Sequence, residues 1–187
     1  MEISKTLYVT NRTAWRSWLK SNGKNEKEIW LIYYKKASGK PRIPYNDAVE
    51  EALCYGWIDG IQKGIDEEKF AQRFSPRKPG SVLSQMNKER IHRLIKQKKM
   101  TAKGLTAVKH VFKELSKNSK CAIKADILKF LKKDKKTWEN FQKFSESYKR
   151  IRIEWIEGTR TRPELFKKRL RYFLKMTANN QKYGIIQ

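Results

Sequence analysis

A helical pattern that stops at a single glycine is the feature that most limits how this chain can fold. Residues 47–55 place four apolar side chains at helical spacing, and Gly56 directly after them is a natural helix stop. Residues 57–66 then alternate in the way of a β-strand, and Gly60 and Gly64 inside that run indicate a bend or bulge. A second strand over residues 69–75 follows after a short turn. This order predicts a helix that leads into an antiparallel hairpin.

The residues before this stretch predict two further elements of the N-terminal half. Thr10 or Asn11 is placed to cap a first helix, whose tryptophans and leucine recur at helical spacing. Residues 28–36 are β-branched and aromatic, which is typical of a buried strand. Asn46 or Asp47 is the expected cap of the helix that the glycine ends. The N-terminal half is therefore expected to mix helices and strands.

After a helix that opens at Ser81 or Ser84, the rest of the chain shows only helical spacing. The apolar sets are Val108, Val111, Phe112 and Leu115, then Ile127, Leu128 and Leu131, then Trp138, Phe141 and Phe144, then Tyr148, Ile151 and Trp155, and finally Phe166, Leu170, Phe173 and Leu174. Pro163 suits the first turn of the last helix. Aromatic residues at this spacing are better explained as helix core than as platforms for stacking nucleic-acid bases.

The fold class expected from these patterns is α+β. A small antiparallel β-sheet packed with helices should form the N-terminal part, and an all-helical region should follow it. A junction within residues 101–120 divides the chain into an α+β domain at residues 1–105 and a helical C-terminal region at residues 106–187.

The chain is strongly basic, with 44 Lys and Arg against 19 Asp and Glu and a formal net charge of +25. Residues 100–187 alone carry 23 basic against 8 acidic residues. A field of that sign attracts polyanions, so weak, nonspecific binding of nucleic acid by the basic C-terminal half is one alternative function. However, 31 of the basic residues are lysines, and many occupy the polar positions of amphipathic helices, where they solvate a surface.

Targeting and redox signals predict a soluble protein of the cytoplasm. No apolar run approaches the roughly 20 residues that span a bilayer. Residues 1–5 lack the apolar core of a signal peptide. The two cysteines, Cys54 and Cys121, do not make a disulfide framework. The sequence leaves the oligomeric state open.

Side chains suited to anion binding gather around the predicted hairpin. Arg73, Ser75 and Arg77 lie on one face of the second strand if the backbone stays extended that far. Arginine offers a planar set of donors to carboxylate or phosphate, and serine adds a hydroxyl. The full predicted ligand set is Trp57, Asp59, Arg73, Ser75, Arg77, Lys78, Asn87 and Arg90. A structural alternative stays open, in which the arginines form ion pairs with Asp59 and Asp66 and join the hairpin to the following helix.

Catalytic chemistry has one candidate, Asp59, as a general base on the same strand face as Trp57. Cys54 is expected to be a small buried residue, and His92 and His110 have no partner at a defined spacing. The sequence contains no metal-ligand cluster, no Walker-type loop, no dinucleotide fingerprint and no serine elbow. These patterns disfavour a familiar enzyme class, and neither a cofactor nor a metal is expected.

One long motif resembles a known bacterial family. Residues 45–59 read Tyr-x-Asp-Ala-Val-Glu-Glu-Ala-Leu-Cys-Tyr-Gly-Trp-Ile-Asp, and residues 73–78 read Arg-Phe-Ser-Pro-Arg-Lys. Both segments are similar to the YdeI/OmpD-associated family, which is also called the bacteriocin-protection family. Trp155-Ile156 and the basic segment at residues 160–169 extend the resemblance over nearly the whole chain. Residues 164–166 depart from it, with Glu-Leu-Phe where the family usually has Glu-Thr-Arg.

The resemblance implies a role in envelope stress or bacteriocin protection, and it names no chemistry. The favoured function is therefore an intracellular protein that binds a small anionic ligand around Asp59. The alternatives are a nonspecific nucleic-acid-binding protein and an uncharacterised enzyme with Asp59 as its general base.

Overall fold

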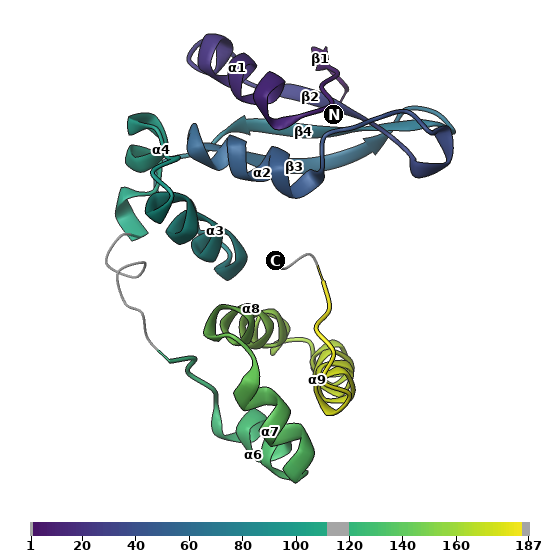
Figure 1. Cartoon of the computed structure of the whole chain (residues 1–187), viewed down its shortest axis with the longest axis vertical. Coiled ribbons are helices and arrows are strands. Elements are labelled where there is room, and N and C mark those ends of the chain that lie inside the picture. Colours follow the sequence, from purple (N-terminus) through teal and green to yellow (C-terminus); the bar gives the residue numbers. More distant parts are fainter. Residues whose placement is uncertain (1, 112–119, 185–187) are drawn as a thin grey trace. The chain divides into compact units, whose positions relative to one another are not determined.

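The computed structural model describes residues 2–111 and 120–184 (Figure 1). The chain divides into two compact units, at residues 1–116 and residues 117–187. Each unit has a hydrophobic core of its own. Within the described ranges, no helix is both long enough and apolar enough to cross a membrane.

A four-stranded sheet forms the centre of the first unit, with its strands in the order β1-β2-β4-β3. Its strands are β1 (Thr6–Leu7), β2 (Ile29–Tyr34), β3 (Trp57–Gly64) and β4 (Lys69–Pro76). Strand β4 is antiparallel to both β2 and β3, which confirms the predicted hairpin. Strand β1 runs parallel to β2, so the sheet is mixed. The register of β3 shifts between Asp59 and Gln62, at the position where Gly60 indicates a bulge.

Helices complete the first unit, and the α+β fold class is confirmed. They are α1 (Arg12–Asn22), α2 (Tyr45–Cys54), α3 (Gln85–Lys96) and α4 (Ala102–Ala107), with the 3-10 turns η1 (Lys36–Ser38) and η2 (Lys109–Val111). The side chain of Asn11 caps α1, as expected, and that of Ser84 caps α3. The expected cap of α2 at Asn46 or Asp47 is wrong. The preceding proline already directs the chain into a helix that begins at Tyr45, so both residues lie inside its first turn.

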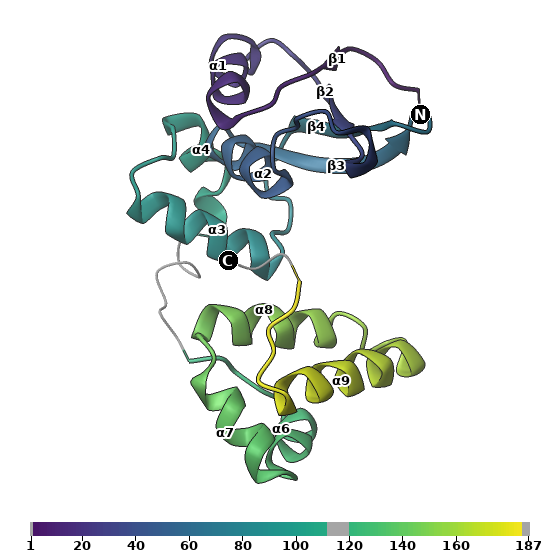
Figure 2. The ribbon, with the colours of Figure 1, turned by 45° about the vertical axis from the view of Figure 1, so that its right-hand side comes forward.

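Helices α1 and α2 share one hydrophobic core with one face of the sheet, and both lie beside the strands in Figure 2. Trp15 and Leu19 of α1 pack in this core together with Leu31 and Phe74 of the sheet, and each of the four is at most 1% exposed. The indole nitrogen of Trp15 donates to the carbonyl oxygen of Ala48 at 3.0 Å, so its polar group is satisfied although it is buried.

Helix α2 also carries two buried carboxylates, Glu50 and Glu51, which are 5% and 3% exposed. Arg12 of α1 donates to both of them, at 2.9 Å in each case. Arg16 of α1 adds a bond of 2.6 Å to Glu51, and Arg93 of α3 donates to Glu50. One acidic pair therefore ties three helices together. Removing one partner of a buried ion pair typically costs about 3–5 kcal/mol, because the other charge is left unpaired.

The C-terminal end of α2 is closed by α4. The backbone amide and the hydroxyl of Thr101 donate to the carbonyl oxygen of Cys54, at 3.0 and 2.6 Å. This satisfies an acceptor that the last turn of a helix leaves free. Gly104 follows on α4, where a Cβ atom would lie only 2.1 Å from the same carbonyl oxygen. The close approach of the two helices therefore requires a glycine at this position.

The second unit contains only helices within its described residues, as expected. They are α6 (Ala125–Lys132), α7 (Lys135–Lys143), α8 (Glu146–Glu157) and α9 (Pro163–Ala178). Pro163 is the first residue of α9, as its sequence position predicts. The aromatic residues Phe141, Tyr148 and Phe173 are at most 3% exposed and belong to the core of this unit. The helical spacing expected at residues 112–115 lies outside the described residues.

We expect Gly104→Ala to destabilise the first unit by roughly 1–3 kcal/mol or more, the usual range for overpacking, because its Cβ would overlap the backbone of α2. Urea denaturation measures the change in the free energy of unfolding. Gly64→Ala is the matched control, because a Cβ at that position of β3 would meet no atom within 4 Å. Its effect should stay within about 0.5 kcal/mol. Equal effects of the two substitutions would contradict the close contact between α4 and α2.

Candidate functional site

The strand register divides the predicted ligand set between the two faces of the sheet. Asp59 pairs with Phe74 across β3 and β4, and Ser75 pairs with Ile58. Residues directly opposite each other in an antiparallel pair share a face, and neighbours along a strand lie on opposite faces. Asp59 therefore lies on the face that carries Phe74 and the helical core. Arg73 and Ser75 lie on the other face.

On that other face, Arg73 has a partner that the sequence analysis did not identify. Its Nε donates to a carboxylate oxygen of Glu28 at 2.7 Å. Glu28 also accepts a hydrogen bond of 2.6 Å from the hydroxyl of Ser4. The bonds from Ser4 and Arg73 hold the pKa of Glu28 below its usual value. Arg73 thus joins β4 to the start of β2.

The alternative in which the arginines form ion pairs with Asp59 and Asp66 is therefore wrong about the partner of Arg73, which is Glu28. It is right that Arg73 forms a structural ion pair. Asp66 accepts from the backbone amides of Glu68 and Lys69, both at 2.9 Å, and so shapes the turn between β3 and β4. Burial alone would raise the pKa of Asp66, but these bonds and the charge of Lys69 together hold it below its usual value. Asp66 forms its ion pair with Lys69 at 3.5 Å.

Two more residues of the predicted set have structural surroundings. Trp57 is fully buried, and its indole nitrogen donates to the carbonyl oxygen of Gly23 at 3.3 Å. Its ring meets that of Trp18 edge to face. Lys78 is exposed in the connection after β4, where its carbonyl oxygen accepts from Ser81.

The remaining predicted residues lie near one another on the core side of the sheet. Asp59 accepts a hydrogen bond of 2.5 Å from the hydroxyl of Tyr45, the first residue of α2. Arg90 of α3 is 9% exposed and donates to the side-chain oxygens of Asn87, at 2.9 Å, and Asn46, at 2.6 Å. Strand β3, the first turn of α2 and the middle of α3 thus supply one group of polar side chains.

Arg77 is the residue of this group whose bonding is least complete. It is 7% exposed, and its Nη2 donates to the carbonyl oxygens of Ser81 and Val82, at 3.0 and 2.5 Å. Its Nε and Nη1 are buried and have no hydrogen-bond partner among the residues that the structure describes. The hydroxyl of Tyr33, which is 2% exposed, also lacks a partner there. Buried polar groups in native proteins are nearly always hydrogen-bonded, so such donors call for an explanation.

The electrostatics of these groups are coupled through Asp59. Burial lowers the pKa of Arg77, and the negative charge of Asp59 opposes that effect. Burial likewise lowers the pKa of Arg90, against the opposing influence of Tyr45 and Asp59. Burial raises the pKa of both tyrosine hydroxyls, Tyr33 and Tyr45, and the charge of Asp59 adds to the effect. The hydroxyls therefore remain protonated donors near neutral pH.

We refer to this group as the Asp59 cluster, and its members are Tyr33, Tyr45, Asp59, Arg77, Asn87 and Arg90. Two arginines against one carboxylate leave it with an excess of positive charge. Arg73, Ser75, Lys78 and Trp57 are not members.

The two units of the chain match different family models. Residues 7–107 match a family model described as a domain of unknown function, DUF8412. The chain belongs to the DUF8412 family. Residues 120–180 match a second model, described as "Bacteriocin-protection, YdeI or OmpD-Associated". No curated protein and no solved structure matches the chain.

The second match confirms the resemblance to the YdeI/OmpD-associated family and shows where in the chain it lies. Trp155 and the basic segment at residues 160–169 are inside the matched range. The long motif at residues 45–59 lies instead inside the range that matches DUF8412. All members of the Asp59 cluster lie in the DUF8412 range as well, so the description of the C-terminal match does not apply to them.

Sequence reasoning missed Tyr33 and Tyr45 in this DUF8412 protein. Tyr33 lies within an apolar, aromatic run, where a tyrosine is indistinguishable from a core residue. Tyr45 is the first residue of the motif at residues 45–59, and its place in that motif could have indicated that it belongs to the site. Cys54 is fully buried, as expected, and burial raises the pKa of its thiol to about 11, which keeps it unreactive near neutral pH. No group of three potential metal ligands occurs among the described residues.

We expect Arg73→Met to raise the pKa of Glu28 toward its ordinary value, because one of the three side-chain hydrogen bonds that stabilise the ionised carboxylate, and the charge of Arg73 with it, is lost. NMR titration of the glutamate carboxyl carbons measures this change. A carboxyl group whose pKa is lower in the folded than in the unfolded chain stabilises the fold above its unfolded pKa. That stabilisation is lost as the pH falls through the folded pKa, so the variant should lose less stability than the wild type over this acidic range. An unchanged Glu28 titration would show that Arg73 does not bind this carboxylate in solution.

Proposed function

We propose that this protein binds a small anionic molecule that also carries a hydrogen-bond donor, and that the Asp59 cluster is the binding site. The observation that carries the proposal is the incomplete bonding of Arg77 within a buried, positively charged group. A buried donor without an acceptor costs roughly 1–3 kcal/mol, and more when it is charged. An anion next to Nε and Nη1 of Arg77 would supply the missing acceptors.

The surroundings of Arg77 favour an anion of a particular kind. Arg90 is anchored by Asn87 and Asn46, so a second guanidinium is held in a fixed position. The hydroxyl of Tyr33 adds a further unpartnered donor to the described cluster. Charge-assisted hydrogen bonds of this kind are suited to a carboxylate or a phosphate. Because the donors are already buried, little side-chain entropy would be lost when such a ligand binds.

Asp59 restricts the ligand further. A carboxylate near the binding groups repels a simple anion, unless the ligand also offers a group that donates to it. A carboxylate has about four lone-pair positions, and Tyr45 donates to only one of its oxygens. A hydroxy acid or an amino acid, in which an anionic group and a donor are close together, satisfies both requirements. A simple carboxylate or sulfate satisfies only the first.

A role in bacteriocin protection or envelope stress is a separate proposal for the whole protein. Its support is the description of the family that residues 120–180 match, a range that contains no member of the Asp59 cluster. The alternative in which Asp59 is a general base is less well supported, because Tyr45 already donates to this carboxylate and no substrate is implied.

We expect Tyr33→Phe to leave the stability of the unliganded protein unchanged or to raise it slightly, because it removes a buried hydroxyl that has no partner among the described residues. The same change should weaken ligand binding. Glycolate and acetate are suitable probes, since they differ mainly in a hydroxyl group. NMR chemical shifts at millimolar concentrations should move amides near Arg77 with glycolate more strongly than with acetate.

Arg77→Met should abolish these shifts, and Asp59→Asn should remove the preference for glycolate over acetate. Arg73→Met is the matched control, because it removes a nearby arginine that is paired with Glu28 and is not a member of the Asp59 cluster. The proposal is wrong if neither probe nor any amino acid shifts these amides, or if Arg73→Met has the same effect as Arg77→Met. A large loss of stability in Tyr33→Phe would also contradict it.

The alternative of nucleic-acid binding rests on the basic charge of residues 100–187. We expect duplex DNA to bind weakly and without sequence preference, because the charge is mostly lysine on helix surfaces. The logarithm of the affinity should fall linearly with that of the salt concentration, by about 0.9 for each phosphate contact. Fluorescence anisotropy with two unrelated duplexes over a salt series measures both properties. Tight, sequence-selective binding near 150 mM salt, roughly the physiological ionic strength, would favour nucleic acid as the principal ligand.

A further inference from the structure

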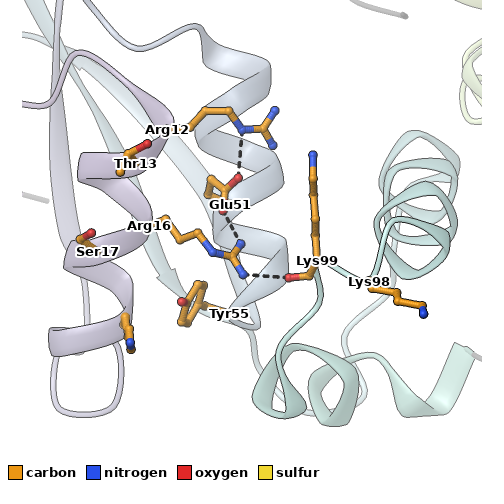
Figure 3. A pocket seen from close by; sticks show the side chains of 9 residues that line it. Arg12, Thr13, Arg16, Ser17, Glu51, Tyr55, Lys98 and Lys99 are labelled. Atoms are coloured by element: carbon orange, nitrogen blue, oxygen red, sulfur yellow. Dashed lines mark hydrogen bonds and ion pairs between the residues drawn. The ribbon is translucent and has the colours of Figure 1, made fainter.

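A second basic feature of the first unit lies away from the Asp59 cluster, beside α1 (Figure 3). It is a surface cavity of about 520 Å³, which is within the usual size range of small-molecule sites. We refer to it as the α1 hollow, and it is lined by Arg12, Thr13, Arg16, Ser17, Lys20, Glu51, Tyr55, Lys98 and Lys99. Five of these side chains are basic and one is acidic.

The two arginines of the α1 hollow are fixed before any ligand arrives. Glu51 is buried and accepts from both Arg12, at 2.9 Å, and Arg16, at 2.6 Å. Arg16 also donates to the carbonyl oxygen of Lys99 at 3.0 Å, and its guanidinium lies 5.3 Å from the ring centre of Tyr55. Figure 3 shows these contacts running from α1 across α2 to the chain after α3. Glu51 therefore holds both arginines with its two oxygens, and Arg12 is held further by Asp47 at 3.1 Å and Glu50 at 2.9 Å.

The lysines of the α1 hollow supply its excess charge. Lys20, Lys98 and Lys99 are exposed, and none of them has a carboxylate within ion-pair distance in the described part of the chain. Lys98 has a left-handed backbone, with φ of 55°, at the end of α3. This turn is closed by bonds from the amides of Lys98 and Lys99 to the last turn of α3, at 2.9 and 3.0 Å. A non-glycine residue in this conformation is uncommon, and here it places two successive lysines opposite α1.

Hydroxyl groups complete the lining. Thr13 and Ser17 are one turn apart on α1, next to the row formed by Arg12, Arg16 and Lys20. Residues four apart lie on the same side of a helix, so hydroxyl and cationic donors form two adjacent rows. A single carboxylate has too few oxygens to use so many donors. A chain of phosphoryl groups has enough, and its several negative charges match the surplus of lysines.

We propose that the α1 hollow binds a small molecule that contains two or more linked phosphoryl groups. Such a group occurs in inorganic polyphosphates and in nucleoside di- and triphosphates. Arg16 and the hydroxyls of Thr13 and Ser17 bind phosphoryl oxygens, and the lysines neutralise the remaining charge, because Arg12 is already paired with three carboxylates. This site is separate from the Asp59 cluster, and each can fail without the other.

Isothermal titration with tripolyphosphate at low ionic strength tests the proposal. Lys98→Gln/Lys99→Gln should lower the affinity roughly tenfold or more, the size expected when charge-assisted hydrogen bonds are lost. Lys35→Gln/Lys36→Gln is the matched control, because it removes two exposed neighbouring lysines elsewhere in the same unit. It should lower the affinity about threefold or less, which measures the general effect of net charge.

Ser17→Ala tests whether specific hydrogen bonds, and not only the positive charge of the protein, bind tripolyphosphate, because this substitution leaves the net charge unchanged. It should weaken tripolyphosphate binding severalfold while the melting temperature of the free protein stays the same, since Ser17 is exposed. ATP distinguishes the two sources of the ligand. Tighter binding of ATP than of tripolyphosphate assigns a nucleotide, and equal binding assigns the phosphate chain alone. Absence of tripolyphosphate binding, or equal losses in the two lysine pairs with no effect of Ser17→Ala, would overturn the proposal.

Discussion

The packing of the first unit depends on two carboxylates that α2 carries into the interior. Glu50 and Glu51 are almost fully buried, and ionised groups in such positions are tolerated only when they are paired. Arginines from α1 and α3 provide the pairing. If either helix moved away, a buried carboxylate would lose an ion-pair partner. The geometry of α1 against α2 is thereby fixed. Both the row of donors along α1 and the first turn of α2, with Tyr45, take their positions from this arrangement.

Much of the fold followed from local patterns in the sequence. The helical spacing before Gly56, the alternation in residues 57–75 and the apolar repeats of the C-terminal half correspond to α2, to the β3–β4 hairpin and to helices α6 to α9. These elements were predictable because one physical signal, the period of apolar residues, dominates in each. The start of α2 and the parallel strand β1 were not predicted. The first was decided by a proline rather than by a side-chain cap, and the second is too short to show a period.

The candidate site was predictable only in part, because its composition depends on which face of a strand each residue occupies. Grouping Asp59 with Arg73 and Ser75 was reasonable from their closeness in sequence, but the register places Asp59 opposite Phe74 and so on the other side of the sheet. A shift of one residue in pairing reverses every such assignment, and no local pattern in β3 fixes the pairing. Tyr33 reaches the cluster from a strand that the sequence marks only as apolar. Such long-range neighbours become visible only in the folded chain.

The register break in β3 has a consequence for how copies of this protein meet. β3 is the last strand of the sheet, and an edge strand offers its backbone to strands of other molecules. A continuous ladder requires matched spacing along both partners, and the shift between Asp59 and Gln62 interrupts that spacing in the middle of the strand. An incoming strand can therefore align with one half of β3 but not with both. The irregularity next to Asp59 thus also disfavours extension of the sheet by the edge strand of a second copy.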